Sequence, residues 1–437
     1  MSTASKMAEY LQAYLETGFF MGSALVACAG EVIFHQSYGM ANLEHGVLNT
    51  SQTKFRIASL TKPFTAAAVL KLQEQGLLDV RHSISAYVPN YPNGEQITIH
   101  HLLTNTAGIP NFTSFPDAEK KQPLKVTLDE LISWFSDKPL HFVPGERYRP
   151  TNSGYVLLAK IIEVASGQSY ADYLRQHILE PANMLNSGYD QQELVLPHRA
   201  SGYLLTEAGY RNPPFWDMSQ PSGAGGMYST TEDLYKWDQA LYTDAVLNEH
   251  SRNIMFSPLV RVGSSEPKEY CGYGWSIDTH YGRDRQMWYG AIHGFRAILS
   301  RYPSEKAVVI ALSNVGDVSI ERIENDLAAI LFNEPYRMPT PPQAINLDSA
   351  VYEAYVGEYS GAYEFAPKYN LIITTESKRI FMNFTGEDRM EIFPASSTQF
   401  FLKVLDLQLT FKVDETGKAS NVIIHQNGRD SVATRMN

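Results

Sequence analysis

Cysteine is almost missing from this chain of 437 residues, which has two, Cys28 and Cys271. A small secreted fold stapled by disulfides has a far higher density of cysteine, and these two lack the close spacing of metal ligands. We therefore interpret both as reduced core residues that carry no chemistry. The sequence predicts neither a metal site nor a cofactor.

Long apolar runs and dense runs of lysine or arginine are also lacking. No stretch is apolar over the length that a bilayer requires, and the N-terminal segment MSTASKMAEYLQAYLETGFF has no continuous apolar region like that of a signal peptide. The formal net charge of -11 and the pI near 5.6 disfavour electrostatic binding to nucleic acid or to an anionic membrane. We expect a cytoplasmic protein, unless a leader peptide has been removed, with neither nucleic acid nor membrane as a partner. Oligomeric state is left open.

What the chain does have is enough apolar sequence for two domains. Hydrophobic residues make up 44% of it, and its length exceeds what one core usually serves. The proline-rich segment EPYRMPTPP cannot continue a helix or a strand ladder. We predict one domain over residues 1–335, a proline-rich linker over 336–345 and a smaller domain over 346–437.

The predicted second domain consists of short β-type runs separated by turn residues. Examples are NLIITT, RIFMNF, LQLTFKV and NVIIHQ. This pattern indicates a small antiparallel barrel or sandwich of about eight strands.

The predicted first domain mixes strand and helix patterns. SALVACAG and EVIFHQSYG indicate paired strands near its start, and AVVIALSNV indicates a strand near its end. Helical patterns cover 63–75, 153–166 and 231–241, and Ser229 with Glu232 fits a capping box before the last of them. Strands at both ends with helices between them predict an α/β sandwich whose sheet joins the two ends of the domain.

The segment FRIASLTKPFTAAAVLKLQEQG is the first candidate for chemistry. Pro63 suits the first turn of a buried helix and Gly76 its end, which places Ser59 at the helix N-terminus. Lys62 lies three residues later on the same face, so its amine is within reach of the serine oxygen. Burial and the positive end of the helix both lower the pKa of a lysine, which allows a neutral amine to take the Ser59 proton.

Several motifs follow one another in a specific order along the chain: FRIASLTKPF, HHLLTNTAGI, FVPGERYRPTNSGYVLLAKIIEVASG, SGAGGMYSTTEDLYKW, GYGWSI, WYGAIHGF and ALSNVG. This order resembles that of the class C β-lactamase-related serine hydrolases, which are similar to penicillin-binding proteins. The resemblance implies a β-lactamase/transpeptidase-like α/β fold and an acyl-enzyme mechanism with Ser59 as nucleophile and Lys62 as its helper. It also implies an oxyanion hole made of the backbone N–H groups of Ser59 and Ala291. The tail ending in VIIHQNGRD resembles the lipocalin-like domain often fused to such hydrolases.

The second motif of the family, Tyr-x-Asn, is altered. Alignment through PGERYRPTNSGY puts Pro150 at the tyrosine and Asn152 at the asparagine. Asn152 still offers hydrogen bonds to Lys62 and to a substrate amide. Proline transfers no proton, so Tyr148 and Tyr289 are candidates for a proton relay, although either of them is explained as well by packing with a solvated hydroxyl. The interpretation we favour is that Lys62 acts alone, with help from a group on the substrate.

The third motif, Lys-Thr-Gly or His-x-Gly in the family, reads Trp288, Tyr289, Gly290 here. A tryptophan cannot hold a substrate carboxylate as a cation does. The change therefore disfavours β-lactams and C-terminal peptides and favours neutral esters or amides. Trp288, Gly290 and His293 are the candidate substrate-binding residues.

Two hypotheses follow. In the first, the chain is a serine hydrolase or acyltransferase of the carboxylesterase or D-peptidase type, with Ser59, Lys62 and Asn152 as catalytic residues. Its substrates are small esters or amides of D-configured or modified peptides, and we expect weak or no β-lactamase activity. In the second, the changes at Pro150 and Trp288 mark a non-catalytic protein that keeps the fold to bind a ligand.

Overall fold

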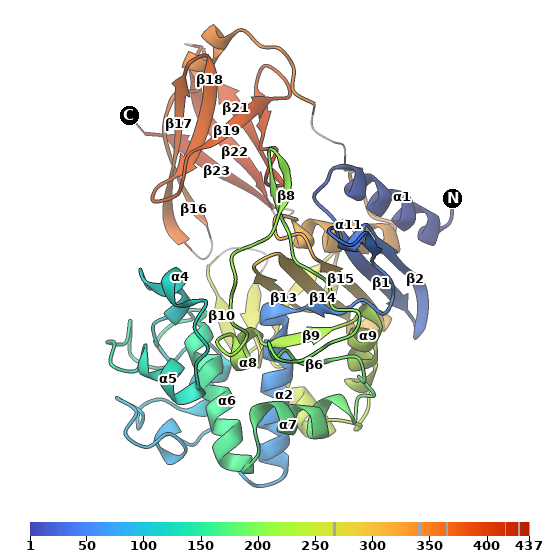
Figure 1. Cartoon of the computed structure of the whole chain (residues 1–437). Coiled ribbons are helices and arrows are strands. Elements are labelled where there is room, and N and C mark those ends of the chain that lie inside the picture. Colours follow the sequence, from blue (N-terminus) through green and yellow to red (C-terminus); the bar gives the residue numbers. More distant parts are fainter. Residues whose placement is uncertain (265–267, 340–342, 364–365, 416, 427–428, 437) are drawn as a thin grey trace.

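The computed structural model describes residues 1–264, 268–339, 343–363, 366–415, 417–426 and 429–436. It folds the chain into a large α/β domain and a closed β-barrel (Figure 1). The predicted fold class is confirmed for both parts, and the choice between barrel and sandwich is resolved as a barrel. Residues 340–342 of the predicted linker lie outside the described residues, and the predicted domain boundaries stay a prediction.

An eight-stranded sheet forms the centre of the α/β domain. In spatial order its strands are β10 (Val260–Val262), β11 (Glu269–Cys271), β12 (Ser276–His280), β13 (Arg283–Ile292), β14 (Phe295–Tyr302), β15 (Ala307–Ser313), β1 (Gly22–Cys28) and β2 (Glu31–Tyr38). The pairs are antiparallel, and β1 lies between β2 and β15. The sheet therefore joins the two ends of the domain, as the sequence predicts.

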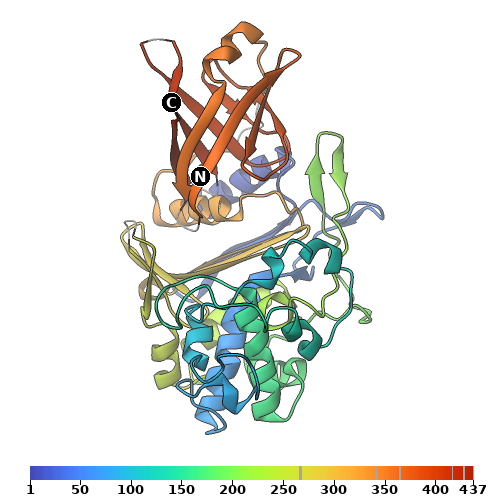
Figure 2. The same cartoon turned by 90° about the vertical axis from the view of Figure 1, so that its left-hand side faces the viewer.

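Both faces of this sheet are covered, which explains why β1 reads as a continuous apolar run. Leu25 and Ala27 enter the core on one face, and Ala24 and Val26 enter the core on the other. The second face is covered by α1 (Thr3–Glu16) and α11 (Ile320–Phe332), which lie between the sheet and the barrel in Figure 2.

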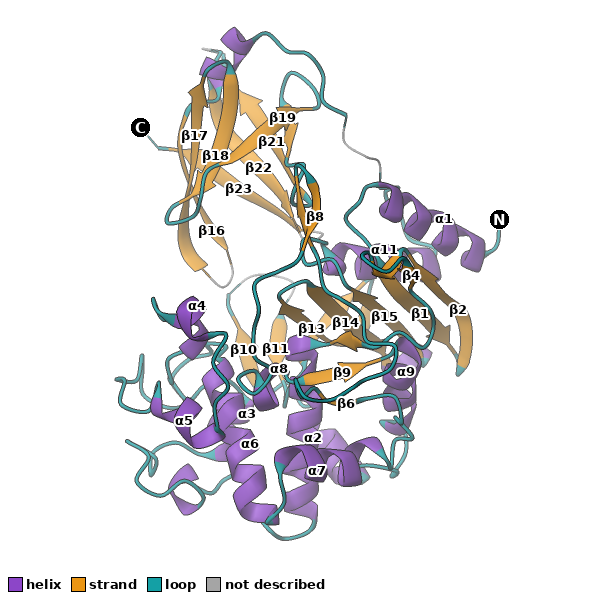
Figure 3. Cartoon of the chain, in the orientation of Figure 1, coloured by secondary structure: helices purple, strands orange, loops and turns teal. Residues whose placement is uncertain are grey.

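The first face carries the remaining helices, which gather on one side of the sheet in Figure 3. These are α2 (Lys62–Glu74), α3 (Ile99–Leu103), α4 (Ala118–Lys121), α5 (Leu128–Ser133), α6 (Asn152–Ser166), α7 (Tyr170–Leu174), α8 (Ser222–Gly225), α9 (Thr231–Ala240) and α10 (Glu249–Met255). Small strands complete this part: β3 (Met40–Asn42) with β4 (Val47–Leu48), β5 (Phe55–Arg56) and β6 (Gly188–Tyr189) on either side of β9 (Met227–Ser229), and β7 (Leu204–Thr206) with β8 (Gly209–Arg211).

Helix α2 is buried on nearly all sides, as expected of a helix that is apolar around its circumference. Pro63 lies in its first turn, and Gly76, at φ +70°, follows its end. The three predicted helices lie within one residue of α2, α6 and α9 at each end. The predicted capping box is wrong by one residue, because the N-cap of α9 is Thr230, whose side chain accepts from the Asp233 N–H.

The barrel is a ring of eight antiparallel strands. They are β16 (Gly357–Tyr363), β17 (Ala366–Glu376), β18 (Arg379–Phe384), β19 (Met390–Pro394), β20 (Gln399–Phe401), β21 (Leu407–Val413), β22 (Ala419–Gln426) and β23 (Arg429–Arg435). The barrel has its own core, in which the rings of Tyr355 and Phe411 stack with their centroids 4.5 Å apart. The barrel interior is therefore filled by its own side chains.

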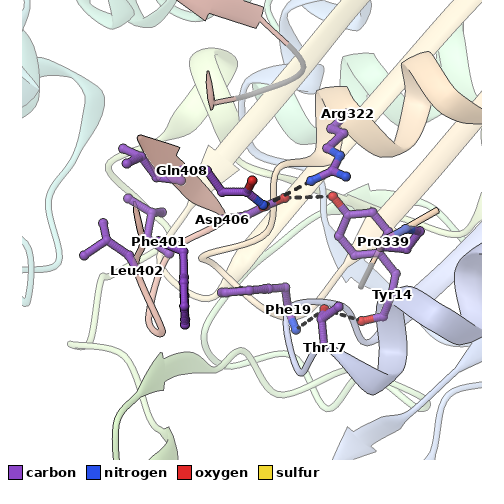
Figure 4. Close-up of a pocket in the computed structure, with 11 residues that line it drawn as sticks. Tyr14, Thr17, Phe19, Arg322, Pro339, Phe401, Leu402, Asp406 and Gln408 are labelled. Carbon is purple, nitrogen blue, oxygen red and sulfur yellow. Dashed lines mark hydrogen bonds and ion pairs between the residues drawn. The ribbon is translucent and has the colours of Figure 1, made fainter. Parts of the chain in front are cut away.

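The barrel contacts the α/β domain at α1 and α11 (Figure 4). The Tyr14 hydroxyl donates to Asp406 Oδ2 at 2.7 Å, and the Arg322 guanidinium lies 3.4 Å from Asp406 Oδ1. Burial raises the pKa of the Tyr14 phenol well above its usual value, so the phenol keeps its proton and donates to the carboxylate. In the described part of the chain, no helix is long and apolar enough to cross a membrane.

Candidate active site

Ser59 lies in a single 3-10 turn, η1 (Ala58–Thr61), directly before α2. The residue before it, Ala58, has φ +47°, a left-handed conformation that side-chain-bearing residues adopt at a cost. Strain of this kind persists where surrounding structure enforces it, as it does between β5, α2 and β13. The turn places Ser59 at the surface of a pocket and not inside the helix.

Strand β13 runs unusually close to this turn at Gly290. A Cβ atom on Gly290 would lie 2.1 Å from the Ile57 carbonyl oxygen and 2.8 Å from the Ser59 nitrogen. Both are backbone atoms that cannot swing aside, so only glycine permits the approach. The next residue, Ala291, consequently lines the same pocket as Ser59.

Lys62 is buried beneath Ser59, and three oxygen atoms surround its amine. Nζ lies 2.8 Å from Ser59 Oγ, 3.0 Å from Asn152 Oδ1 and 3.0 Å from the Ala224 carbonyl oxygen. Burial lowers the pKa of Lys62 to about 7. The amine is therefore neutral in a large fraction of molecules at neutral pH.

The geometry directs the lone pair of that neutral amine. Of the three oxygens, those of Asn152 and Ala224 belong to carbonyl groups that only accept hydrogen bonds. These two oxygens accept hydrogen bonds from the two N–H groups of the neutral amine. The lone pair of the amine then faces Ser59 Oγ, which is the one partner of the three that has a proton to donate. Lys62 is thus held as a base toward Ser59.

The pocket beside Ser59 is neutral and partly aromatic. None of the described residues that line it has a charged side chain. The lining consists of Ala58, Ser59, Phe112, Thr113, Asn152, Trp216, Pro221, Ala224, Gly225, Ala291 and Ile292. We refer to it below as the Ser59 pocket.

Neither tyrosine predicted as a proton relay is among the hydrogen-bond partners found for the Lys62 amine in the described residues. Pro150, which stands at the motif tyrosine, is exposed, and the half-buried Tyr148 has a pKa raised well above its usual value, mainly by burial. Tyr289 is 41% exposed and shares its strand face with Met287, which packs on the α1 and α11 side of the sheet. The hydrogen bonds of Lys62 Nζ go to other groups, and both relay roles stay predictions.

The predicted substrate-binding residues Trp288, Gly290 and His293 are not among the described residues that line the Ser59 pocket. Trp288 is half-buried and packs against the core that contains α2. His293 Nδ1 lies 3.1 Å from the Pro214 carbonyl, and its ring centroid lies 5.1 Å from that of Trp216. His293 therefore holds in place the segment that supplies Trp216 to the Ser59 pocket. Direct contact of Trp288, Gly290 or His293 with a substrate stays a prediction.

Sequence reasoning missed three contributors to the site. The Ala224 carbonyl belongs to the backbone of α8, so no side-chain pattern marks it, although the SGAGG segment was part of the recognised motif order. Trp216 lies in a loop just after two prolines, and Thr113 lies in a short 3-10 helix, Phe112–Ser114, that follows the HHLLTNTAGI motif. Both lie far along the chain from Ser59, and folding alone brings them to it.

Comparison with known proteins agrees with this geometry. Residues 7–331 match the protein family described as Beta-lactamase. The chain belongs to this family of serine hydrolases, which includes the penicillin-binding proteins. Residues 341–435 match a family described as a domain of unknown function, DUF3471. The lipocalin-like character of the barrel stays a prediction.

Individual relatives extend the likeness to the whole chain. Penicillin-binding protein 4* of Bacillus subtilis (strain 168) is 32% identical over 440 residues, which cover 95% of this chain and 95% of that protein. The octameric penicillin-binding protein homologue of Pyrococcus abyssi has a TM-score of 0.67 at 23% identity, over 98% of this chain and 99% of its own. A D-amino acid amidase of Ochrobactrum anthropi SV3 has a TM-score of 0.67 at 24% identity, over 76% of this chain and 99% of its own. At these identities the two solved structures show a shared fold.

Proposed function

We propose that this member of the beta-lactamase family hydrolyses small neutral esters or amides through an acyl-enzyme on Ser59. One observation carries the proposal: Lys62 Nζ lies 2.8 Å from Ser59 Oγ, its other two partners are carbonyl oxygens at 3.0 Å, and burial lowers its pKa to about 7. A serine with such a base beside it is an activated nucleophile.

In the proposed reaction, Ser59 Oγ forms a bond to the substrate carbonyl carbon as its proton moves to Lys62 Nζ. The developing oxyanion is held by the backbone N–H groups of Ser59 and Ala291, which line one pocket. Lys62 then returns the proton to the leaving group as the scissile bond breaks. A water molecule then gives a proton to Lys62 as its oxygen bonds to the acyl carbon, and Lys62 passes that proton to Ser59 Oγ as the acyl–Oγ bond breaks and the acid leaves.

The uncharged lining of the Ser59 pocket supports a neutral substrate. A carboxylate would find no cation among the described lining residues, and Trp288 stands where the family motif has a basic residue. Phe112 and Trp216 offer apolar surface for an acyl or leaving group. We expect small esters and amides, including those of D-configured amino acids, to react, and β-lactams to react weakly or not at all.

Active-site labelling tests the proposal. The protein is incubated with a fluorophosphonate, its intact mass is measured, and the adduct is located by peptide mapping. We expect one adduct on Ser59, lost in Ser59→Ala and kept in Ser133→Ala, which changes an exposed serine of α5. The same panel includes p-nitrophenyl acetate, D-phenylalanine amide and a chromogenic cephalosporin. Correctly folded protein that takes no label and hydrolyses no ester would favour the non-catalytic binding hypothesis.

A further inference from the structure

The hydrogen bonds around Asn152 form a set in which the orientation of each amide is determined. Lys62 Nζ donates to Asn152 Oδ1 at 3.0 Å, so Nδ2 of Asn152 points the other way, to Thr113 Oγ1 at 3.2 Å. The Asn152 backbone N–H donates to Asn111 Oδ1 at 3.1 Å, so Nδ2 of Asn111 points to Thr113 Oγ1 at 2.8 Å. Each orientation is fixed by a donor. The Lys62 amine donates to the side chain of Asn152 and the Asn152 backbone N–H donates to the side chain of Asn111, and a donor faces the oxygen of an amide and not its NH₂ group.

Thr113 therefore has one hydrogen-bonding group left. A hydroxyl has two lone pairs and one proton, and both lone pairs of Thr113 are occupied by the two amides. Within the described chain, Thr113 donates to no protein group. Its side chain is half-buried and lines the Ser59 pocket. Because its oxygen accepts two hydrogen bonds, its own O–H becomes a stronger donor.

We propose that Thr113 is a substrate-positioning residue, whose hydroxyl donates a hydrogen bond to a neutral carbonyl oxygen of the substrate outside the scissile group. This inference rests on the proposed function and narrows its substrate class to esters and amides that carry a second carbonyl acceptor. The acceptor is neutral because the site presents a hydroxyl and two amides in place of a cation. Thr113 is not a proton relay, since the amide of Asn152 between it and Lys62 does not titrate.

The test compares matched substrates that differ in one amide group. For the acyl side, the pair is N-acetylglycine p-nitrophenyl ester and 4-methylpentanoic acid p-nitrophenyl ester. For the leaving-group side, the pair is 2-acetamidoethyl acetate and 4-methylpentyl acetate. In each pair a methyl group replaces the carbonyl oxygen and a methylene replaces the N–H, so the number of heavy atoms is preserved while the amide's hydrogen-bonding groups are removed.

We expect Thr113→Val to lower kcat/KM about tenfold for the acetamido member of one pair and less than about threefold for its apolar partner. Thr113→Ser, which keeps the hydroxyl, restores the preference. The pair that responds identifies which half of the substrate the hydroxyl holds. Equal losses in both members of both pairs would overturn the proposal.

A fluorophosphonate without a carbonyl group separates this outcome from other failures. Its labelling rate reports whether Ser59 and Lys62 remain intact in Thr113→Val, and we expect that rate to stay within about threefold of wild type. If the wild-type protein takes no label and hydrolyses no substrate, the proposed function itself fails and this inference with it. If labelling is normal but the substrate preference does not depend on the Thr113 hydroxyl, only this inference fails.

Discussion

The Ser59 pocket and the barrel interior both bury hydroxyl groups, but the two regions use them differently. In the barrel, the Tyr359 hydroxyl donates to the Tyr355 carbonyl at 2.7 Å, and the Tyr355 hydroxyl donates to the Ser397 carbonyl. In the pocket, the Thr113 hydroxyl proton has no protein acceptor among the described residues, and burial lowers the pKa of the Lys62 amine to about 7. These two barrel hydroxyls donate to backbone carbonyls of the barrel itself, whereas the Thr113 hydroxyl in the pocket keeps a proton to donate to another molecule.

Strained backbone also flanks the pocket, although positive φ values occur elsewhere as well, for example at Ser377 and Lys378 in the barrel. Ala58 and Ser222 adopt positive φ values of 47° and 42°, and they flank the groups that surround Lys62, since Ser222 begins α8 and Ala224 belongs to it. Residues in such conformations persist where packing enforces them and often mark functional sites. The barrel strands instead bury aromatic and aliphatic side chains in a filled core. The groups that surround Lys62 all belong to the α/β domain, and the barrel contacts that domain at α1 and α11.

Removal of the base should produce the largest effect on the pocket. Lys62→Met removes the proton acceptor of Ser59, and we expect kcat/KM for an ester to fall about 10³-fold. In the wild type, kcat/KM should rise with pH as the Lys62 ammonium, with its pKa of about 7, loses its proton, and should level off above that pH. The measurement is a pH–rate profile.

The matched control for this prediction is Lys71→Met, which changes a partly exposed lysine on the same helix that pairs with Glu74. Its profile should keep the wild-type midpoint. A wild-type rate that falls as pH rises through 7 would contradict the assignment of Lys62 as the base.

The close approach of β13 to the Ser59 turn gives the next largest effect. In Gly290→Ala the added methyl would meet backbone atoms, so the strand and the turn must separate. A displacement of about 1 Å costs about 10²-fold in rate, and we expect a loss of that size in kcat/KM together with a lower melting temperature. The control is Asp284→Ala, which changes an exposed residue of the same strand that does not line the Ser59 pocket. A mild Gly290→Ala phenotype would mean that the pocket tolerates more movement than its packing suggests.

Some features of the fold and the site can be predicted from the sequence, and others cannot. Ser59, Lys62 and Asn152 could be located because local helix signals and motif spacing fix them, and the closure of the sheet by β1 and β15 follows from apolar runs at both ends. The capping box was displaced by one residue because STTED fits the motif at Ser229 and again at Thr230. Thr113 and the Ala224 carbonyl escaped because their roles depend on tertiary contacts with Asn152 and Lys62, for which a single sequence carries no local signal.

A cavity in the barrel core should change stability and leave the pocket unaffected. Phe411 contacts Tyr355, Tyr359 and Phe400, and Phe411→Ala should lower the free energy of unfolding of the barrel by about 3–5 kcal/mol. Two quantities are measured: the free energy of unfolding, by urea denaturation, and the rate of Ser59 labelling in the folded protein at low urea. We expect that rate to stay within about twofold of wild type. A proportional loss of labelling would show that the pocket depends on barrel packing and would break the comparison.

The smallest effect is expected at the contact between the barrel and the α/β domain, where Asp406 contacts Tyr14 and Arg322. Asp406→Ala leaves the buried Tyr14 hydroxyl without its acceptor, which costs about 1–3 kcal/mol. Asp406→Asn keeps an oxygen that accepts from Tyr14 and loses only the partly exposed ion pair with Arg322, which is worth about 1 kcal/mol or less. Thermal melts of both variants at low and high salt therefore separate the hydrogen bond from the ion pair. Equal destabilisation by the two substitutions would assign the contact to charge, and slower Ser59 labelling in either variant would show that barrel docking controls the pocket.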